Sequence, residues 1–378
     1  MKQEQNVEFE ATALLERFKK EYADLLRSTP FSLEKLFAPE HFSFGDFCQG
    51  FSAHPQSDEL KWIIQVFGEN HRIWLPNAKH HVTCALFLYP NGKFERMLTM
   101  MKNLTLGFYL NDIMGRDTFK FLPVEQQEVS RKIIEGMSSL DDTLYIPTVA
   151  HTLELVNVEV LKEFKDTSPE EWFSQFLRLY CYHIGITHTD GNTTATGHIP
   201  GIQDYMDRRC HLGGVHHILM WIEYSDGQFL DWELLTALDI AQSLKRLHWV
   251  TAAFAGLSND LFSFEKEVID HGSDSNLVMI IALNQVDLPL KEAIFRASEI
   301  VKNLLTELLE LLDFIKAMAE RFTQTYPAHA TKLNTHLYGI VRCVQAIWLW
   351  HCHSQRYKRP FSLWIETRLG SETVATKI

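Results

Sequence analysis

Three oxygen-bearing side chains stand four residues apart in one stretch of the chain: Asn259, Ser263 and Glu267. The run from Leu234 to Ile269 consists mostly of good helix formers without proline, and it predicts one long helix. Each four-residue step turns about 40° around a helix, so the three oxygens form one stripe. Amide, hydroxyl and carboxylate oxygens suit Mg²⁺, whose coordination is usually completed by waters and substrate phosphates. The spacing therefore indicates a magnesium site for a phosphorylated ligand.

The apolar neighbours of this stripe favour a buried site. A helix with Asn, Ser and Glu on one side is most often a solvent-exposed face, and that is the simplest alternative. Here, however, Phe254 to Leu257 lead into the stripe, and Phe262 and Phe264 flank its serine. Polar oxygens in an apolar setting need partners, and a metal ion supplies them. Lys266, beside the glutamate, is placed to reach a phosphate on that metal.

A second acidic cluster ends a helix predicted over residues 94–117. Asp112 follows an apolar run and stands four and three residues after Phe108 and Tyr109, so both rings lie on its side of the helix. Asp117 comes five residues later, about 140° around an ideal helix, and does not share that stripe. We expect Asp112 to bind metal. Asp117 is either a second ligand or an exposed charge paired with a neighbouring cation.

Two further segments place cations where an anion can bind. Arg208 and Arg209 precede a Gly-Gly pair that begins at Gly213 and predicts a break between two helices. The alternative is an ordinary helix C-terminus with cations near its dipole. Near the end of the chain, Arg356 offers a planar fork of donors to phosphate oxygens, and the Tyr357 hydroxyl adds one more.

In their order along the chain, these segments resemble the motifs of bacterial class I terpene synthases. The stripe matches the family's N-D-L-x-S-x-x-x-E motif, and Asp112 stands where the family carries its aspartate-rich motif, although Ile113 replaces the second aspartate. Arg209, Leu212 and Gly213 stand where the family has a diphosphate-sensing arginine, a linker and an effector glycine. The Arg-Tyr pair matches the family's C-terminal R-Y.

The resemblance implies an α-helical bundle around a central cavity that binds an isoprenyl diphosphate. It implies three Mg²⁺ ions, held by Asp112, Asp117, Asn259, Ser263 and Glu267. It implies that the diphosphate receives hydrogen bonds from Arg209, Lys266, Arg356 and Tyr357. The Gly213 carbonyl would face the nascent carbocation, and the pocket would be lined by Phe108, Tyr109 and Leu212. The reaction is that of a carbon–oxygen lyase, with farnesyl or geranylgeranyl diphosphate as substrate.

The pattern of helices along the chain predicts an all-α protein, and composition argues against other classes. The 378 residues carry 48 acidic against 36 basic side chains, a net charge of −12, so we do not expect a nucleic-acid surface. No window approaches the roughly 20 apolar residues that span a bilayer. Six scattered cysteines without a C-x-x-C pair indicate reduced thiols in a cytoplasmic protein, and a homodimer is one option for its assembly.

The chain predicts a single domain, with an irregular helical part over residues 1–94, a bundle over 95–357 and a tail over 358–378. Helices are expected over residues 94–117, 124–138, 145–163, 169–186, 200–209, 214–224, 231–269, 286–321 and 328–356. The eighteen histidines lack the H-E-x-x-H spacing of zinc sites. His216 and His217 follow the glycine break closely enough for one of them to face the cavity.

Three alternatives remain at this point. A prenyl-chain-elongating transferase would share the fold and the metals, but it normally has two D-D-x-x-D motifs. A metal-dependent hydrolase would need a general base and more His or Asp ligands than these helices carry. A non-catalytic helical binding protein is the alternative from a different class, and the incomplete aspartate motif is its best argument.

Overall fold

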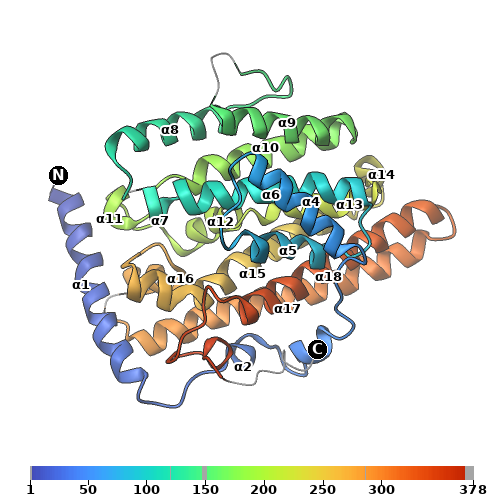
Figure 1. The fold of residues 1–378 in the computed structure, drawn as a ribbon. Helices are drawn as coiled ribbons and strands as arrows, with labels where there is room; N and C mark the ends of the chain where they lie inside the picture. The colour runs from blue at the N-terminus through green and yellow to red at the C-terminus, as the bar shows by residue number, and fades with distance from the viewer. Residues whose placement is uncertain (1, 120, 147–150, 286, 371–378) are drawn as a thin grey trace.

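The protein is an assembly of α-helices joined by short turns, as the sequence predicts (Figure 1). The computed structural model describes residues 2–119, 121–146, 151–285 and 287–370. In these ranges, extended pairing is limited to two isolated β-bridges, Phe31 with Trp364 and Arg359 with Arg368. None of the described helices is both long and apolar enough to cross a membrane.

The elements follow one another without a strand in the described ranges. The N-terminal ones are α1 (Lys2–Leu25), α2 (Leu33–Phe37), α3 (Phe44–Phe47), α4 (Ser57–Asn70) and α5 (Ala78–Leu88). The middle of the chain forms α6 (Phe94–Met114), α7 (Arg116–Phe119), α8 (Val124–Ser138), α9 (Thr152–Asp166), α10 (Glu170–Thr187), α11 (Thr193–Thr196), α12 (Ile202–Leu212) and α13 (Val215–Asp226). The remainder forms α14 (Trp232–Ala237), α15 (Ala241–Phe264), a π-helical turn η1 (Glu265–Asp270), α16 (Leu277–Leu283), α17 (Leu290–Phe322), α18 (Pro327–His353) and a 3₁₀ turn η2 (Ile365–Thr367).

Helix α15 runs through the middle of the bundle. From Val250 to Ser258 every residue is buried, because this part of the helix is apolar or small on all sides and has no face suited to water. It packs against α12, α13, α17 and α18. Helix α6 lies across from it and packs against α4, α5, α9 and α13, while α8, α9 and α10 form the layer beyond (Figure 1). The two helices that carry the main acidic motifs are therefore separated by the interior of the bundle.

Both ends of the chain fasten onto the turn that follows α15. The buried Glu265 carboxylate in η1 accepts hydrogen bonds from the Tyr22 hydroxyl (2.8 Å) and the Leu363 backbone N–H (2.9 Å). The C-terminal segment also caps the N-terminus of α2, since the Glu366 carboxylate accepts a hydrogen bond from the Leu33 N–H at 3.0 Å. The N-terminal and C-terminal parts thus support the end of the helix that carries the predicted metal stripe.

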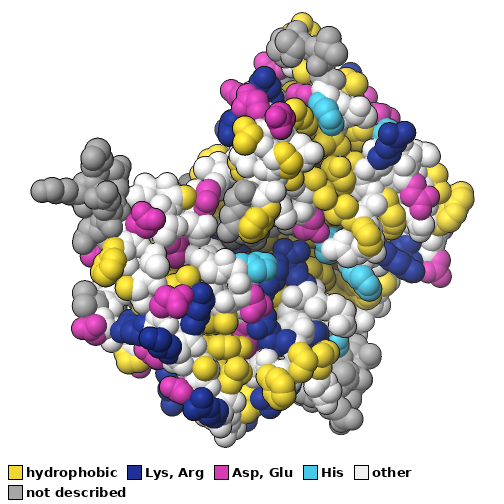
Figure 2. Space-filling view, turned by 60° about the vertical axis from the view of Figure 1, so that its left-hand side comes forward, with side chains coloured by type: hydrophobic (Ala, Val, Ile, Leu, Met, Phe, Trp, Pro, Cys, Tyr) yellow, Lys and Arg dark blue, Asp and Glu magenta, His cyan; other side chains and the backbone are white. Residues whose placement is uncertain are grey.

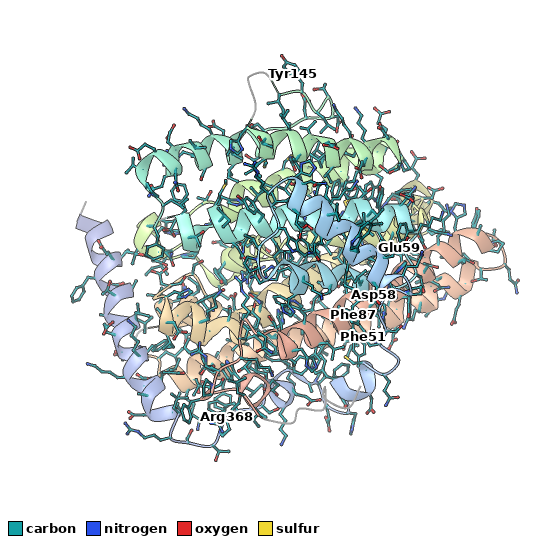
Figure 3. All side chains as sticks on the ribbon, in the orientation of Figure 1. Phe51, Asp58, Glu59, Phe87, Tyr145 and Arg368 are labelled. Atoms are coloured by element: carbon teal, nitrogen blue, oxygen red, sulfur yellow. The ribbon has the colours of Figure 1, made fainter. Side chains whose placement is uncertain are left out.

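The loop before α4 is held by aromatic contacts on the outside of the bundle. Figure 3 shows Phe51 next to Phe87 of α5, and their rings stack at 5.3 Å between centroids. The Arg342 guanidinium of α18 lies 4.3 Å from the centre of the Phe51 ring and donates to the Ser52 carbonyl. These contacts tie the loop to two of the helices that form the cavity.

Several predicted helix boundaries were wrong, each for a local reason. The expected helix over 231–269 is interrupted between α14 and α15, where Asp239 has a left-handed φ of +57°, and it turns π-helical at Glu265. The helix over 94–117 stops at Gly115, where a Cβ would lie 2.1 Å from the Asn111 carbonyl. The helix over 145–163 begins at Thr152, behind a His151 cap, and residues 147–150 lie outside the described part.

Two further differences concern the C-terminal half. The short apolar helix α16 was not predicted; its N-terminus is capped by the Asn276 side chain, which accepts from the Val278 N–H. The last long helix ends at His353 and not at residue 356, so Arg356 and Tyr357 lie in the turn after it. Residue 286, the predicted start of the preceding helix, lies outside the described residues, and α17 begins at Leu290.

Candidate active site

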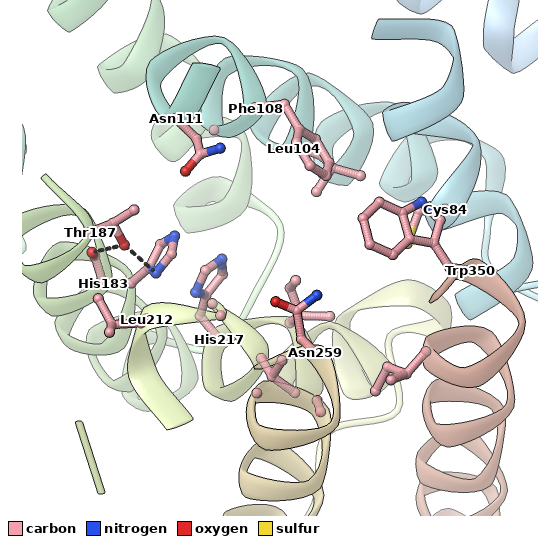
Figure 4. A pocket seen from close by; sticks show the side chains of 18 of the residues that line it. Cys84, Leu104, Phe108, Asn111, His183, Thr187, Leu212, His217, Asn259 and Trp350 are labelled. Atoms are coloured by element: carbon pink, nitrogen blue, oxygen red, sulfur yellow. Dashed lines mark hydrogen bonds between the residues drawn. The ribbon is translucent and has the colours of Figure 1, made fainter. Parts of the chain in front are cut away.

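A cavity of about 300 Å³ lies between α6 and α15. Helices α5, α10, α12, α13 and α18 complete its wall (Figure 4). Figure 2 shows the corresponding face of the molecule hollowed, with basic side chains at the centre of the hollow and apolar ones beside them. The basic side chains that line the cavity, apart from histidines, are Arg209 and Arg356. An apolar chamber with two arginines is suited to a ligand with an apolar body and an anionic group.

Helix α6 presents one stripe of residues to the cavity. Leu104, Gly107, Phe108 and Asn111 follow the i, i+3, i+4, i+7 spacing of one helix face, and all four line the cavity. Figure 4 shows Asn111 and Phe108 pointing into it. Phe108 therefore lies where the sequence placed it. Tyr109 is not part of the cavity wall, because the next residue on a helix points about 100° away.

A buried ion pair positions Arg209 in the cavity wall. The Arg209 Nε donates to Asp260 Oδ1 at 2.7 Å, and its Nη2 donates to the Asn259 Oδ1 at 2.8 Å. Asp260 is fully buried, and its other oxygen accepts from the Tyr205 hydroxyl (2.6 Å) and the Leu277 N–H (2.9 Å). Burial lowers the pKa of Arg209, but the nearby Asp260 and other groups raise it by a larger amount. The net pKa lies above its ordinary value, so the guanidinium stays charged.

The choice between the two adjacent arginines follows from their directions. Arg208 lies with its guanidinium against Gly191, where a Cβ would be 3.2 Å from Nη2, and it does not line the cavity. Leu212 and Gly213 do line it. Gly213 ends α12, and the following Gly214 adopts a left-handed φ of +69°, which confirms the predicted break between two helices.

The Arg-Tyr pair lies beside the stripe residues although it is far away in sequence. The Tyr357 hydroxyl accepts from Asn259 Nδ2 at 2.8 Å, and Arg356 Nη1 lies 3.5 Å from Asp112 Oδ1. Burial lowers the pKa of Arg356, but Tyr357, Asp112 and Glu267 together raise it above its ordinary value. The carboxylates of Asp112 and Glu267, on opposite sides of the cavity, thus act on the same guanidinium.

The predicted stripe is present, but its last member sits on a different kind of turn. Glu267 belongs to the π-helical turn η1, in which hydrogen bonds span five residues, so its direction differs from that on an α-helix. Its carboxylate lines the cavity and accepts from Asn276 Nδ2 at 3.5 Å. Ser263 is fully buried, one turn of helix before it, and lies outside the cavity wall.

The Ser263 hydroxyl is the observation that bears on a bound metal. Its Oγ is buried and has no hydrogen-bond partner among the residues that the structure describes, a state that costs free energy unless a ligand satisfies it. With the Asn259 amide and the Glu267 carboxylate it forms a donor set of oxygens, which fits Mg²⁺. Among the residues the structure describes, no three His, Cys, Asp or Glu side chains gather as a metal site. That is expected for a set in which two donors are an amide and a hydroxyl.

Besides Tyr109 and Ser263, three further predicted residues lie outside the cavity wall or outside the described part. Asp112 is at the rim, where it faces Arg356 and accepts from Asn77 Nδ2 at 3.4 Å, while the preceding Asn111 lines the cavity. Lys266 is half-buried in η1 and does not line the cavity, because its neighbour Glu267 takes the inward direction. The side chain of Asp117 lies outside the described residues.

Sequence reasoning missed two polar groups of this site. Asp260 bonds to Arg209, and the sequence contained a sign of this role, because an aspartate inside an apolar run must have buried partners. His351 of α18 lies 3.0 Å from Asn259 Nδ2 through its Nε2, and no local pattern marks it among eighteen histidines. Both positions depend on contacts between elements far apart in the chain.

Comparison with known families agrees with this geometry. The sequence matches the family described as terpene synthase family 2, C-terminal metal binding, over residues 102–307. That span is more than half of the chain and includes Asp112, Arg209 and the stripe from Asn259 to Glu267. The chain therefore belongs to this family of terpene synthases, whose description implies a divalent metal. The resemblance drawn from the motifs is thereby confirmed.

Two relatives are about a quarter identical to this chain over the segments that match. The sesquiterpene cyclase hepA of Aspergillus oryzae is 25% identical over 178 residues, which cover 47% of this chain and 45% of that protein. The spiroviolene synthase of Streptomyces violens is 26% identical over 179 residues, or 46% of this chain and 44% of that protein. The matched segments thus span less than half of the length of these relatives.

Solved structures share the fold over most of its length. The germacradien-4-ol synthase of Streptomyces citricolor superimposes with a TM-score of 0.66 at 15% identity, covering 86% of this chain and all of that one. An α-eudesmol synthase superimposes with a TM-score of 0.63 at 17% identity, covering 80% of this chain and 97% of that one. At these identities the similarity is one of fold, and it confirms the predicted helical bundle.

Proposed function

We propose that this protein is a Mg²⁺-dependent terpene cyclase that ionises an isoprenyl diphosphate, cyclises the carbocation and releases diphosphate. The observation that carries the proposal is the polar cluster around Asn259 at one end of an apolar cavity. Arg209, Tyr357 and His351 all bond to this one side chain, and the charge of Arg356 is stabilised by the carboxylates of Asp112 and Glu267. A diphosphate with its metals would bind among these groups, and an isoprenyl chain would occupy the cavity beyond.

The residues divide into metal-binding and diphosphate-binding sets. Mg²⁺, in three ions by the family resemblance, would be held by Asp112, Asn259, Ser263 and Glu267, with Asp117 as a further candidate. When bound, it supplies charge that stabilises the leaving diphosphate. Arg209, Arg356 and Tyr357 would donate hydrogen bonds to the same oxygens as negative charge develops on them. Lys266 remains a predicted donor from the turn beside Glu267.

The cavity wall would protect and steer the carbocation. Phe108, Tyr180 and Trp350 line it and present ring faces or edges to its interior, and a cation is attracted to aromatic faces. Apolar side chains from α5, α6 and α18 limit the access of water, which would otherwise quench the cation. The Gly213 carbonyl, at the break between α12 and α13, is proposed to face the nascent positive charge.

A fifteen-carbon substrate is favoured over a twenty-carbon one. A volume of about 300 Å³ is at the lower end of the range for small-molecule pockets, about 300 to 1,000 Å³. One of the two relatives is named a sesquiterpene cyclase. We therefore propose farnesyl diphosphate as the substrate, with geranylgeranyl diphosphate as the comparison. A cytoplasmic location is proposed because all six cysteines are free thiols and five of them are buried.

The direct test is incubation of the purified protein with farnesyl or geranylgeranyl diphosphate, with and without Mg²⁺. We expect diphosphate release and a cyclic product in the mass spectrum of the organic extract, and both should require Mg²⁺. The amount of product should be larger with farnesyl diphosphate than with geranylgeranyl diphosphate. Addition of isopentenyl diphosphate tests the transferase alternative, which predicts a longer prenyl diphosphate. A helical binding protein would release no diphosphate in any arm, and that result would contradict the proposal.

Ser263→Ala separates a metal ligand from a structural residue. Because its Oγ is buried and has no partner among the described residues, removal should not lower the free energy of unfolding of the metal-free protein, but it should raise the Mg²⁺ concentration needed for half-maximal turnover at least about tenfold. The matched control is Ser258→Ala on the same helix. Its buried Oγ bonds to the Ala255 carbonyl within the helix, so its Mg²⁺ requirement should stay unchanged. Equal Mg²⁺ curves for both variants would exclude Ser263 as a ligand.

A further inference from the structure

Two histidines from different helices share one wall of the cavity. His183 of α10 and His217 of α13 both line it, and their ring centroids are 5.0 Å apart. Figure 4 shows the two rings side by side, across the cavity from Trp350. Neither is bonded to the Asn259 cluster by the contacts that define it. The metal and diphosphate assignments above give these two side chains no role.

The hydrogen bonds of His183 determine which ring nitrogen carries the proton. Its Nδ1 lies 2.9 Å from the His211 carbonyl oxygen, which can only accept, so Nδ1 is the N–H donor. The Thr187 Oγ1 lies 3.1 Å from the same nitrogen and donates its own proton to the His183 carbonyl. The lone pair is therefore on Nε2, which Figure 4 shows on the side of the ring turned away from Thr187.

His183 is kept neutral and therefore able to accept a proton. Burial lowers its pKa to about 4, although the bond to the His211 carbonyl opposes that shift. At neutral pH the Nε2 lone pair is free for a proton. A C–H bond next to a carbocation is far more acidic than an imidazolium, so even this weak base is strong enough to remove its proton. Once protonated, the ring keeps its Nδ1–H bond to a carbonyl oxygen, which stabilises the imidazolium.

We propose that His183 is the base that ends the reaction, with His217 as the residue that positions it. This rests on the proposed cyclase function. A C–H bond beside the last cationic centre breaks, its electron pair forms a C=C bond, and the proton adds to Nε2 of His183. The products are a neutral olefin and an imidazolium, which returns its proton to water after the olefin leaves. No oxidant or reductant is required.

The second histidine and a glycine hold the base in place. The His217 ring meets the edges or faces of Phe176, Tyr180 and Trp221 at 5.6 to 6.2 Å between centroids. A Cβ on Gly214 would lie 2.9 Å from His217 Cε1 and 3.2 Å from His183 Cε1. The left-handed glycine at the helix break is therefore what allows both rings to approach the cavity at this point.

The same site offers a matched control. His216 is the neighbour of His217 on α13, but its ring lies tilted against that of His211 at 4.3 Å between centroids and does not line the cavity. Its Nε2 is buried and has no hydrogen-bond partner in the described part of the chain, so it resembles His217 in chemistry and differs in direction. A role in ending the reaction predicts an effect at positions 183 and 217 and none at position 216.

The experiment measures the amount of the main olefin relative to the diphosphate released, for wild type, His183→Phe, His217→Phe and His216→Phe. This ratio is independent of how fast each variant turns over. We expect it to fall at least about tenfold in His183→Phe, with other hydrocarbons or alcohols in its place, and to fall less in His217→Phe. His216→Phe should give the wild-type ratio.

A second substitution at the same position keeps the test valid if His183→Phe does not fold. His183→Asn keeps an amide N–H for the His211 carbonyl but has no basic nitrogen, so it should give the same change in products as His183→Phe. Wild-type product ratios in both His183 variants would overturn the proposal, and so would a wild-type product that is entirely alcohol, because water would then end the reaction. Failure of the proposed function looks different: the wild type itself would release no diphosphate with Mg²⁺.

Discussion

At the scale of single residues, the side chains of the site are held in position by hydrogen bonds within the protein. Arg209 is held at one nitrogen by Asp260 and offers another to Asn259, so its direction is fixed before a ligand arrives. The Asp260 carboxylate satisfies three donors, two from α12 and one from α16, while it is fully buried. An arginine fixed in this way loses little conformational freedom when it binds an anion.

Removal of the Asp260 carboxylate should therefore be costly. In Asp260→Ala, Arg209 keeps its charge but loses its counter-ion, and the Tyr205 hydroxyl and the Leu277 N–H each lose the acceptor that they share with it. We expect a loss of about 3 to 5 kcal/mol in the free energy of unfolding, measured by urea denaturation. Tyr205→Phe, which removes one of the three donors, should cost only about 1.5 kcal/mol. Equal losses in both variants would contradict the assignment of Asp260 as the counter-ion.

At the scale of elements, the close approach of α12 to α15 places the arginine beside the stripe. Gly256 of α15 makes this approach possible, because a Cβ there would lie 3.0 Å from the Arg209 carbonyl oxygen and 3.2 Å from its Cγ. The contact is with backbone as well as side chain, so it cannot be relieved by a rotamer change alone. Three residues later the same helix presents Asn259 to the Arg209 guanidinium.

Gly256→Ala and Gly107→Ala should have opposite effects on stability. Alanine is favoured over glycine inside a helix by about 1 kcal/mol, and a Cβ on Gly107 of α6 meets no atom within 4 Å. Gly107→Ala should therefore raise the melting temperature. Gly256→Ala must instead push α12 away from α15, so we expect a lower melting temperature and at least about a tenfold loss of diphosphate release. A stabilised and fully active Gly256→Ala protein would show that the helices are free to separate.

At the scale of the whole molecule, the bundle buries an unusual number of neutral histidines. Burial lowers the pKa of His183 to about 4 and the pKa values of His216 and His336 to about 3. His248 and His336 share one hydrogen bond between their Nε2 atoms at 2.7 Å, which requires that one of the two nitrogens lacks a proton. These rings link α10, α13, α15 and α18, the helices around the cavity.

Stability should decline in mild acid. Between about pH 6.5 and pH 4 each of these histidines binds more protons in the unfolded chain, where its pKa is ordinary, than in the folded chain, and together they outweigh Glu223, whose pKa burial raises to about 8 and which acts in the opposite direction. The stability present above pH 6.5 is therefore lost as the pH falls, by up to about 1.4 kcal/mol per pH unit for each such histidine. Urea denaturation at pH 7.5, 6 and 5 measures this slope. His216→Phe should reduce it by one histidine's share, and a slope of zero would mean that these rings are protonated in the folded protein.

The sequence by itself determined the class of fold and indicated the type of ligands in the candidate site. Helix periodicity and the absence of proline predicted the long helices, because these signals act within a few residues. The four-residue spacing of Asn259, Ser263 and Glu267 indicated oxygen ligands on one side of a helix, and the Gly-Gly pair indicated the break at Gly213. Each of these inferences needs only the local geometry of one segment, and the family match agrees with them.

Only the tertiary structure decided which faces meet. It showed that Arg209 and not Arg208 turns to the cavity, that Asn111 lines it while Asp112 lies at its rim, and that Asp260 is the buried counter-ion. It also brought His183 and His217 together from two helices. A helix pattern states which residues share a face but not what that face touches. That depends on how the helices pack, down to the absence of a single Cβ at Gly214 or Gly256.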